Sequence, residues 1–228
     1  MKALNEAGIY PEVISGVSAG AIVGALYADG HTPDRIFEIF SEEKSFFKYV
    51  KFIVPRKGMF KTAGLKENLS KNLNAKTFEE LKLPLFVAAT DISRGEIVYF
   101  NSGEIVDRVL ASAAIPVLFE PVEIDGNLFV DGGVLDNFPV TPLAKDCMQL
   151  VGISLNPICA ADHFNSLFKI AERTFHLSVS SNITPKIARC DMVFEPEELG
   201  NYGLLDASKG REMFDLGYRM AAKLLKLN

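Results

Sequence analysis

The stretch VISGVSAGAIVGALYA, residues 13–28, is the part of the sequence that decides the fold class. It begins with a short apolar run typical of a buried strand and continues from Ala19 with small and apolar residues typical of a packed helix. Between them, Gly16-Val17-Ser18-Ala19-Gly20 is a G-x-S-x-G motif in the strand–turn–helix setting that this motif requires. A serine on such a turn faces the N–H groups at the start of the helix. Ser18 is therefore a candidate nucleophile, with a mere tight turn as the alternative.

The rest of the chain repeats this alternation of strand and helix. Its 228 residues are 48% apolar and 23% charged, which is enough to bury a sizeable core in one domain spanning residues 1–228. Short apolar runs alternate with stretches of helical period, the pattern of an α/β protein with a mainly parallel sheet covered on both faces. The predicted sheet strands are residues 13–15, 85–90, 150–155 and 192–194.

Helices and hairpins fill the segments between these strands. Helices are predicted at residues 19–28, from Thr32-Pro33-Asp34 onward, and at residues 105–114, 164–180 and 206–227. Two hairpins are predicted, one pairing residues 86–91 with 96–100 and the other pairing 122–124 with 128–130. The second hairpin leads directly to Asp131.

Charge and cysteine content exclude several classes of protein. A net charge of −5, with no basic patch, disfavours nucleic acid as a partner. The three cysteines are odd in number and far apart, so neither a disulfide framework nor a metal site is predicted. The sequence has no apolar run of membrane-spanning length, and residues 1–6 do not form a signal peptide. We expect a cytoplasmic or membrane-peripheral protein, with an upstream targeting signal left open.

A serine nucleophile needs a base, and Asp131 is the candidate that the strand pattern favours. It ends the apolar run 128–130 and is followed by Gly132 and Gly133, so it stands on rigid backbone with little side-chain cover. The alternative is a plain Asp-Gly turn, as expected at Asp125-Gly126. The three histidines, His31, His163 and His176, are more typical of loop or packed-helix positions.

Several segments together carry a resemblance to a known family. They are the elbow motif with the helix after it, Ala111-Ser112-Ala113-Ala114-Ile115-Pro116, Phe119 to Pro121, Asp131-Gly132-Gly133, Asn137-Phe138-Pro139 and Leu216-Gly217-Tyr218. In combination they resemble the bacterial patatin-like phospholipases, and the resemblance extends over nearly the whole chain.

This resemblance implies a three-layer α/β/α sandwich and a catalytic dyad of Ser18 and Asp131. The implied activity is that of a serine lipid acyl hydrolase of the phospholipase, lysophospholipase or carboxylesterase type, working through an acyl-enzyme. Its partner would be a lipid or ester substrate, with transient contact to a membrane surface, and no metal or organic cofactor is implied. The N–H of Ala19 would bind the oxyanion, and Gly16, Gly20, Gly132 and Gly133 would be the motif glycines.

The start of the sequence departs from the family pattern. Members usually begin with a strand and a glycine-rich loop of the form G-G-G-x-R-G, whereas Met1 here falls inside the helix that follows. We expect a form without this loop to be a weak catalyst, because each oxyanion donor contributes about 10²–10³ in turnover.

Aromatic residues after the second predicted helix suggest where an acyl chain could be covered. Phe46 and Phe47 are the candidate substrate contacts, whereas Ile36, Phe37, Ile39 and Phe40 have the spacing of a buried helical stripe. For the aromatic region as a whole, core packing is the favoured interpretation and contact with lipid is the alternative.

Two other interpretations stay open. The order Ser18, Asp131, then His163 or His176 also fits an α/β-hydrolase triad, although few residues precede Ser18 for that fold. A lipid-binding or regulatory relative that has lost catalysis is the second.

Overall fold

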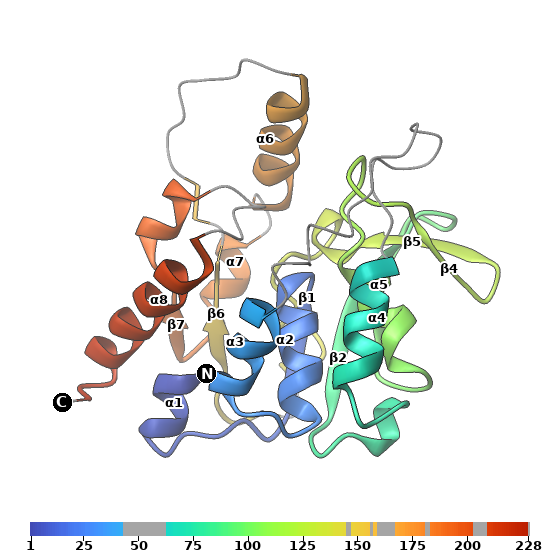
Figure 1. The fold of residues 1–228 in the computed structure, drawn as a ribbon. Coiled ribbons are helices and arrows are strands. Elements are labelled where there is room, and N and C mark those ends of the chain that lie inside the picture. Colours follow the sequence, from blue (N-terminus) through green and yellow to red (C-terminus); the bar gives the residue numbers. More distant parts are fainter. Residues whose placement is uncertain are drawn as a thin grey trace. The chain divides into compact units, whose positions relative to one another are not determined.

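The computed structural model describes residues 1–42, 63–144, 147–155, 157–158, 167–180, 183–202 and 209–227 (Figure 1). The chain divides into two compact units, one formed by Met1–Tyr10 with Leu143–Asn228 and the other by Pro11–Pro142. Both candidate catalytic residues, Ser18 and Asp131, belong to the second unit.

The unit of residues 11–142 contains a mixed five-stranded sheet. Its strands are β1 (Ile14–Val17), β2 (Leu85–Asp91), β3 (Glu96–Phe100), β4 (Val122–Ile124) and β5 (Asn127–Asp131). Only the β1–β2 pair is parallel in this sheet; β2–β3, β2–β5 and β4–β5 are antiparallel. The described sheet is thus less parallel than predicted, because the two hairpins contribute four of its five strands and hairpin strands are antiparallel by construction.

Strand β2 is the centre of this sheet. Val87, Ala88 and Ala89 are fully buried, as expected of a strand covered on both sides. Helix α2 (Ala19–Ala28) packs on β1 and β2, and α5 (Ile105–Ser112) packs on β2, β4 and β5. The two helices also contact each other, so they cover the same face of the sheet (Figure 1). Ala89 and Ala111 pack with Ile124 and Phe129 in the core between α5 and the sheet.

Both predicted hairpins form, and the second has the turn that its sequence indicates. Asp125 and Gly126 join β4 to β5 with φ values of 50° and 78°. Positive φ at both positions is the signature of a type I′ turn, whose twist matches that of the flanking strands. This tight turn fixes the register of β5 and therefore the place where Asp131 ends it.

The remaining helices of this unit show what the sequence pattern could and could not reveal. Helix α3 (Pro33–Glu42) begins where predicted, and Thr32 Oγ1 caps it by accepting a hydrogen bond from the Arg35 N–H at 3.2 Å. Ile36 and Ile39 are buried, which confirms part of the predicted stripe. Helix α4 (Ala63–Asn72) and the 3₁₀ helix η1 (Phe78–Glu80) were not predicted. Helix α4 carries only Leu65 and Leu69, at i and i+4 spacing, among mostly polar residues, so its helical period is weak.

The other unit combines a small parallel sheet with helices. Strands β6 (Val151–Ile153) and β7 (Met192–Phe194) pair in parallel, and both were predicted. The helices are α1 (Lys2–Glu6), α6 (Leu167–Ser180), α7 (Thr184–Ile187), η3 (Glu197–Asn201) and α8 (Gly210–Leu224). Helix α1 packs on α8, where the Tyr218 hydroxyl donates to Glu6 Oε2 at 2.6 Å. Among the described helices of both units, none is long and apolar enough to cross a membrane.

Candidate active site

Ser18 sits between the end of β1 and the start of α2, on the turn that the motif predicts. Its φ of 52° and ψ of −123° lie in a region that residues with a side chain rarely adopt. Gly16 is required by the tightness of this turn, because a Cβ there would lie 2.5 Å from the Gly20 carbonyl oxygen. A Cβ at Gly20 would meet no atom within 4 Å. The first glycine of the motif therefore has a steric role that the second does not share.

Asp131 ends β5 and begins the 3₁₀ helix η2 (Gly132–Val134). The residue is only 2% exposed, and its Oδ1 accepts a hydrogen bond from the Gly133 N–H at 2.7 Å. A Cβ at Gly132 would overlap the backbone carbonyl of Ala88, so this position needs glycine. The Gly133 N–H serves to orient the carboxylate, which gives the second glycine a role in holding the aspartate.

The register on β2 explains why these two residues meet. Strand β3 occupies one edge of β2 at Val87 to Asp91, so β1 and β5 must both use the other edge. On that edge Val17 is paired with Ala88, and Asp131 is paired with the next residue, Ala89. The end of β1 and the end of β5 thus arrive at neighbouring positions from opposite directions. Ser18 follows Val17 directly, and its side chain lies close enough to the Asp131 carboxyl to lower the pKa of that group.

Burial controls the charge state of this aspartate. Desolvation raises the pKa of Asp131 from 3.8 to about 6, although the hydrogen bonds from Ser18 and Gly133 act in the opposite direction. The carboxylate is then ionised above about pH 6 but binds a proton more readily than an exposed aspartate. A carboxylate with these properties is suited to accept a proton from the hydroxyl beside it.

Backbone and side-chain contacts hold the turn after Asp131. The Asp131 N–H donates to the Ala114 carbonyl at 2.9 Å, and the Thr90 hydroxyl donates to the Asp131 carbonyl at 3.1 Å. Farther along, the Tyr99 hydroxyl donates to Asp136 Oδ2 at 2.6 Å. Sequence reasoning did not identify Thr90, Tyr99 or Asp136, because neither their spacing nor their residue type distinguishes them from core and turn positions.

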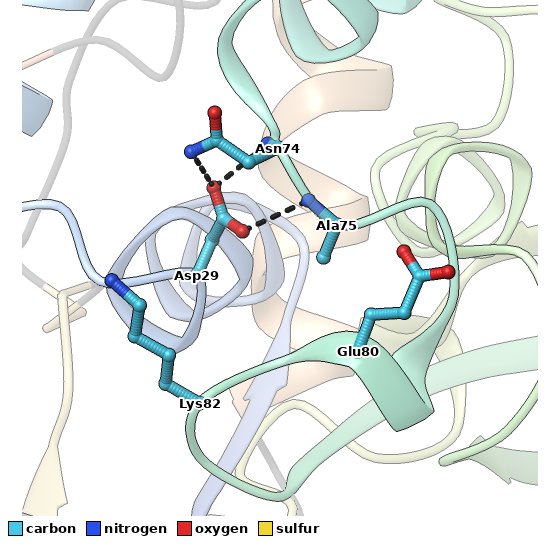
Figure 2. A pocket seen from close by; sticks show the side chains of 5 residues that line it. All are labelled: Asp29, Asn74, Ala75, Glu80 and Lys82. Atoms are coloured by element: carbon cyan, nitrogen blue, oxygen red, sulfur yellow. Dashed lines mark hydrogen bonds between the residues drawn. The ribbon is translucent and has the colours of Figure 1, made fainter.

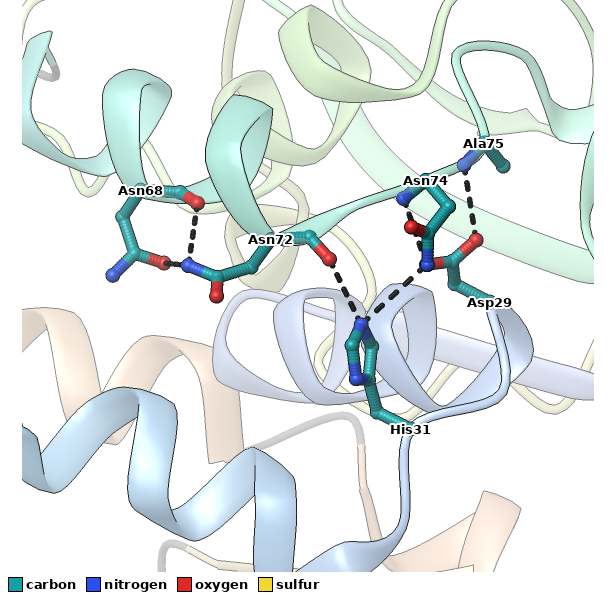
Figure 3. A network of polar contacts seen from close by, with 6 residues as sticks. All are labelled: Asp29, His31, Asn68, Asn72, Asn74 and Ala75. Carbon is teal, nitrogen blue, oxygen red and sulfur yellow. Dashed lines mark hydrogen bonds and ion pairs between the residues drawn. The ribbon is translucent and has the colours of Figure 1, made fainter.

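His31 is engaged at the other end of α2 from Ser18. Its Nε2 lies 2.8 Å from the Asn72 carbonyl oxygen and 3.5 Å from Asp29 Oδ2, as Figure 3 shows. Both neighbours are acceptors, so this nitrogen carries the proton. Helix α2 has ten residues, which separates its two ends by about 15 Å. His31 is therefore too far from Ser18 to act as its base.

The same end of α2 contains a polar pocket of about 420 Å³, lined by Asp29, Asn74, Ala75, Glu80 and Lys82 (Figure 2). Asp29 is buried, and its carboxylate accepts from the backbone N–H groups of Asn74 and Ala75 at 2.9 and 3.0 Å. These bonds tie the end of α2 to the segment after α4. The pocket is polar and lies away from Ser18, so it is unsuited to an acyl chain at the candidate site.

The described structure does not place the other predicted residues relative to the candidate site. Phe46, Phe47 and His163 lie outside the described residues. His176 lies on α6, in the unit that does not contain Ser18. Within the part of the chain that is described, no group of three or more His, Cys, Asp or Glu side chains is placed to hold a metal ion.

The fold and the site define an α/β protein with a nucleophile elbow and an aspartate beside it. The family model for patatin-like phospholipases matches residues 1–144, well over half of the chain. This chain belongs to the patatin-like phospholipase family. The predicted α/β sandwich is confirmed by this match and by the solved structure of VipD from Legionella pneumophila, with a TM-score of 0.55 and 17% identity. That similarity covers 98% of this chain and 63% of VipD.

Relatives of known sequence come from bacteria, fungi and animals. An uncharacterized NTE family protein of Mycobacterium tuberculosis is 26% identical over 80% of this chain and 54% of its own length. Lysophospholipase nte1 of Aspergillus niger is 26% identical over 99% of this chain but only 17% of the relative. Human patatin-like phospholipase domain-containing protein 6 is 30% identical over 61% of the chain and 11% of the relative. The chain thus spans about half or less of the length of these relatives.

Proposed function

We propose that this chain is a serine lipid acyl hydrolase that uses Ser18 as nucleophile and Asp131 as base. The observation that carries the proposal is that the register on β2 brings Ser18 beside the buried Asp131 carboxylate, whose pKa is raised to about 6. Membership of the patatin-like phospholipase family supports lipid esters as the substrate class. The fungal relative named a lysophospholipase supports a single-chain phospholipid as the first substrate to test.

The proposed reaction has two halves that share one base. In the first, Ser18 Oγ attacks the ester carbonyl carbon while its proton passes to Asp131, and the tetrahedral intermediate then collapses to an acyl-enzyme. The leaving alcohol takes the proton from Asp131. In the second half, Asp131 takes a proton from water, the hydroxide attacks the acyl carbon, and the fatty acid leaves as Ser18 regains its proton.

The start of α2 supplies the electrostatic stabilisation in this proposal. Ala19 is the first residue of α2, and the first N–H groups of a helix have no partner within the helix. We assign the Ala19 N–H as a donor to the oxyanion, supported by the positive end of the helix dipole.

A base without histidine is consistent with the desolvation of Asp131. An exposed aspartate is a poor base at neutral pH, but burial raises its proton affinity and direct contact removes the need for a relay. With a pKa of about 6, the carboxylate is mostly ionised at neutral pH and is still a stronger base than an exposed aspartate. An α/β-hydrolase triad would instead need a histidine beside Ser18, and His31 is held elsewhere.

The test measures hydrolysis of a lysophospholipid and of a short-chain p-nitrophenyl ester by the wild type, Ser18→Ala, Asp131→Asn and a matched control. Ser15→Ala is that control, because the Ser15 hydroxyl is also on β1 and is buried without a hydrogen-bond partner among the described residues. We expect Ser18→Ala to lose all turnover above background and Ser15→Ala to keep it. A wild type that binds lipid vesicles but hydrolyses neither ester would support a non-catalytic relative and refute the proposal.

A further inference from the structure

Ser112, the last residue of α5, bridges the nucleophile turn and the central strand with a single hydroxyl. Its Oγ accepts a hydrogen bond from the Ser18 N–H at 2.9 Å and donates one to the Ala88 carbonyl at 2.6 Å. The residue is fully buried. Removing the hydroxyl would therefore leave two buried backbone groups without a partner.

The position of this hydroxyl follows from the β1–β2 ladder. The Ile14 N–H donates to the Pro84 carbonyl at 3.0 Å, and the bonds of a parallel ladder recur at every second residue. With Ile14 paired to Leu85 and Val17 to Ala88, the same pattern would join the Ser18 N–H to the Ala88 carbonyl. In the structure both groups instead bond to Ser112 Oγ. The Ser112 hydroxyl thus replaces the last hydrogen bond of the β1–β2 ladder, at the point where β1 ends.

This substitution matters because the conformation of Ser18 is strained. A non-glycine residue at a φ of 52° and a ψ of −123° costs about 1–3 kcal/mol and persists only when its surroundings fix it. The Ser18 carbonyl is held by the N–H groups of Ala21 and Ile22 at 3.0 and 3.2 Å, on the helix side. Ser112 holds the N–H on the strand side. Without Ser112, the Ser18 N–H could relax toward the free Ala88 carbonyl and carry the hydroxyl out of the elbow geometry.

The segment that contains Ser112 also contacts the proposed base. Two residues after Ser112, the Ala114 carbonyl accepts a hydrogen bond from the Asp131 N–H at 2.9 Å. The chain from 112 to 114 therefore fixes the backbone of Ser18 at one end and that of Asp131 at the other. Helix α5, packed on β2, β4 and β5, supports this segment.

We propose that Ser112 is a positioning residue that holds the backbone of Ser18 in the conformation needed for attack. The inference rests on the proposed function, because it concerns the geometry of that nucleophile. Ser112 does not touch the substrate and donates no proton to the reaction. Its loss should lower the rate of acylation more than the affinity for the ester.

The experiment compares Ser112→Ala and Ser112→Cys with the wild type, measuring kcat, KM, melting temperature and the rate of Ser18 labelling by a small fluorophosphonate. Cysteine fills the space of the serine side chain, being slightly larger, but is a weak hydrogen-bonding group. We expect both variants to lose about 10- to 100-fold in kcat and in labelling rate, with KM little changed, as displacement of a reacting group by about 1 Å can cost 10²-fold. Ser112→Cys should melt closer to the wild type and keeps the test decisive if Ser112→Ala folds poorly.

Ser154→Ala is the matched control for stability alone. Ser154 is also buried, and its hydroxyl donates to Glu195 Oε1 at 2.6 Å in the unit that does not contain Ser18. We expect a lowered melting temperature with kcat and labelling rate unchanged. Wild-type kcat and labelling in Ser112→Cys, or an equal loss in Ser154→Ala, would overturn the positioning role while leaving the proposed function intact. A wild type that is not labelled at Ser18 would refute the proposed function, and the role of Ser112 with it.

Discussion

The turn at Ser18 and the turn at Asp131 lie side by side, yet the unfavourable contribution to the free energy of the folded state is different at each turn. Ser18 has an unfavourable backbone, with φ at 52°, and is held by the hydrogen bond that its N–H donates to Ser112 of α5. Asp131 has a negative φ, of −46°, and its own side chain accepts a hydrogen bond from the N–H of Gly133, two residues on. Its unfavourable feature is the burial of a carboxylate. Conformational strain therefore belongs to the proposed nucleophile and electrostatic strain to the proposed base.

Of the changes considered in this comparison, Asp131→Asn should have the largest effect. It should lower the turnover and raise the stability of the folded protein. Turnover should fall by about 10²–10⁴, the usual contribution of a general base. Stability at pH 8 should rise, because a pKa raised from 3.8 to about 6 means that the ionised carboxylate costs the folded state about 3 kcal/mol. Ester hydrolysis and urea unfolding of the purified variant measure the two quantities.

The sign of this stability effect can be checked through pH. The folded protein binds the Asp131 proton more tightly than the unfolded chain, so stability falls as pH rises from about 4 to about 6. The gain from Asp131→Asn should therefore vanish below pH 4, where the carboxyl is neutral in both states. A variant that is less stable than the wild type at pH 8 would contradict desolvation as the dominant effect at this turn.

The next largest effect should be a loss of kcat/KM at low pH. If Asp131 is the base, activity should be constant above its pKa of about 6 and fall about tenfold for each pH unit below it. A neutral ester avoids titration of the substrate itself. Activity that stays constant down to pH 4.5 would show that another group accepts the proton.

Substitution of the two motif glycines, Gly16 and Gly20, tests what determines the backbone of the Ser18 turn. Gly16→Ala should lose about 1–3 kcal/mol or more in stability, because its Cβ would lie 2.5 Å from the Gly20 carbonyl oxygen. Gly20→Ala should be neutral or gain up to about 1 kcal/mol, since it lies in α2 with open space around the new Cβ. Equal losses in thermal unfolding would mean that the close approach of backbones does not define this turn.

His31→Ala should have the smallest effect on catalysis. It removes one hydrogen bond to the Asn72 carbonyl, which contributes about 1 kcal/mol to stability, at the far end of α2. Turnover should stay at the wild-type level while the melting temperature falls slightly. A strong loss of turnover in a protein that still melts cooperatively would favour a triad over the dyad.

The two proposed catalytic residues could be predicted from sequence because each lies in a local motif with its own geometry. Gly16 to Gly20 predicts a turn within five residues, and Asp131 follows a strand that its type I′ turn delimits. Ser112 could not be assigned a role in this way, although it lies in a stretch that resembles the family. Its partners, Ser18 and Ala88, are brought to it only by the packing of α5 and the register of β1 on β2.

The same distinction applies to the fold: features set by neighbouring residues could be predicted, and features set by contacts between distant parts of the chain could not. Both hairpins and the strands β1, β2, β6 and β7 follow from apolar runs and turn residues. The placement of β1 and β5 end to end on one edge of β2 does not, because it depends on pairing between residues about 40 positions apart for β5 and about 70 for β1. Helix α4 has only Leu65 and Leu69 at helical spacing, and two apolar residues among polar ones are too weak a pattern to distinguish a helix from a loop.

Labelling of the wild type by a fluorophosphonate, followed by peptide mapping across a pH series, tests the dyad most directly. The account predicts one adduct, on Ser18, that forms faster as pH rises through about 6 and is slowed severely in Asp131→Asn. Ser18→Ala should take up no probe. An adduct on another residue, or labelling of Ser18 at the same rate in Asp131→Asn, would contradict the proposed dyad of Ser18 and Asp131.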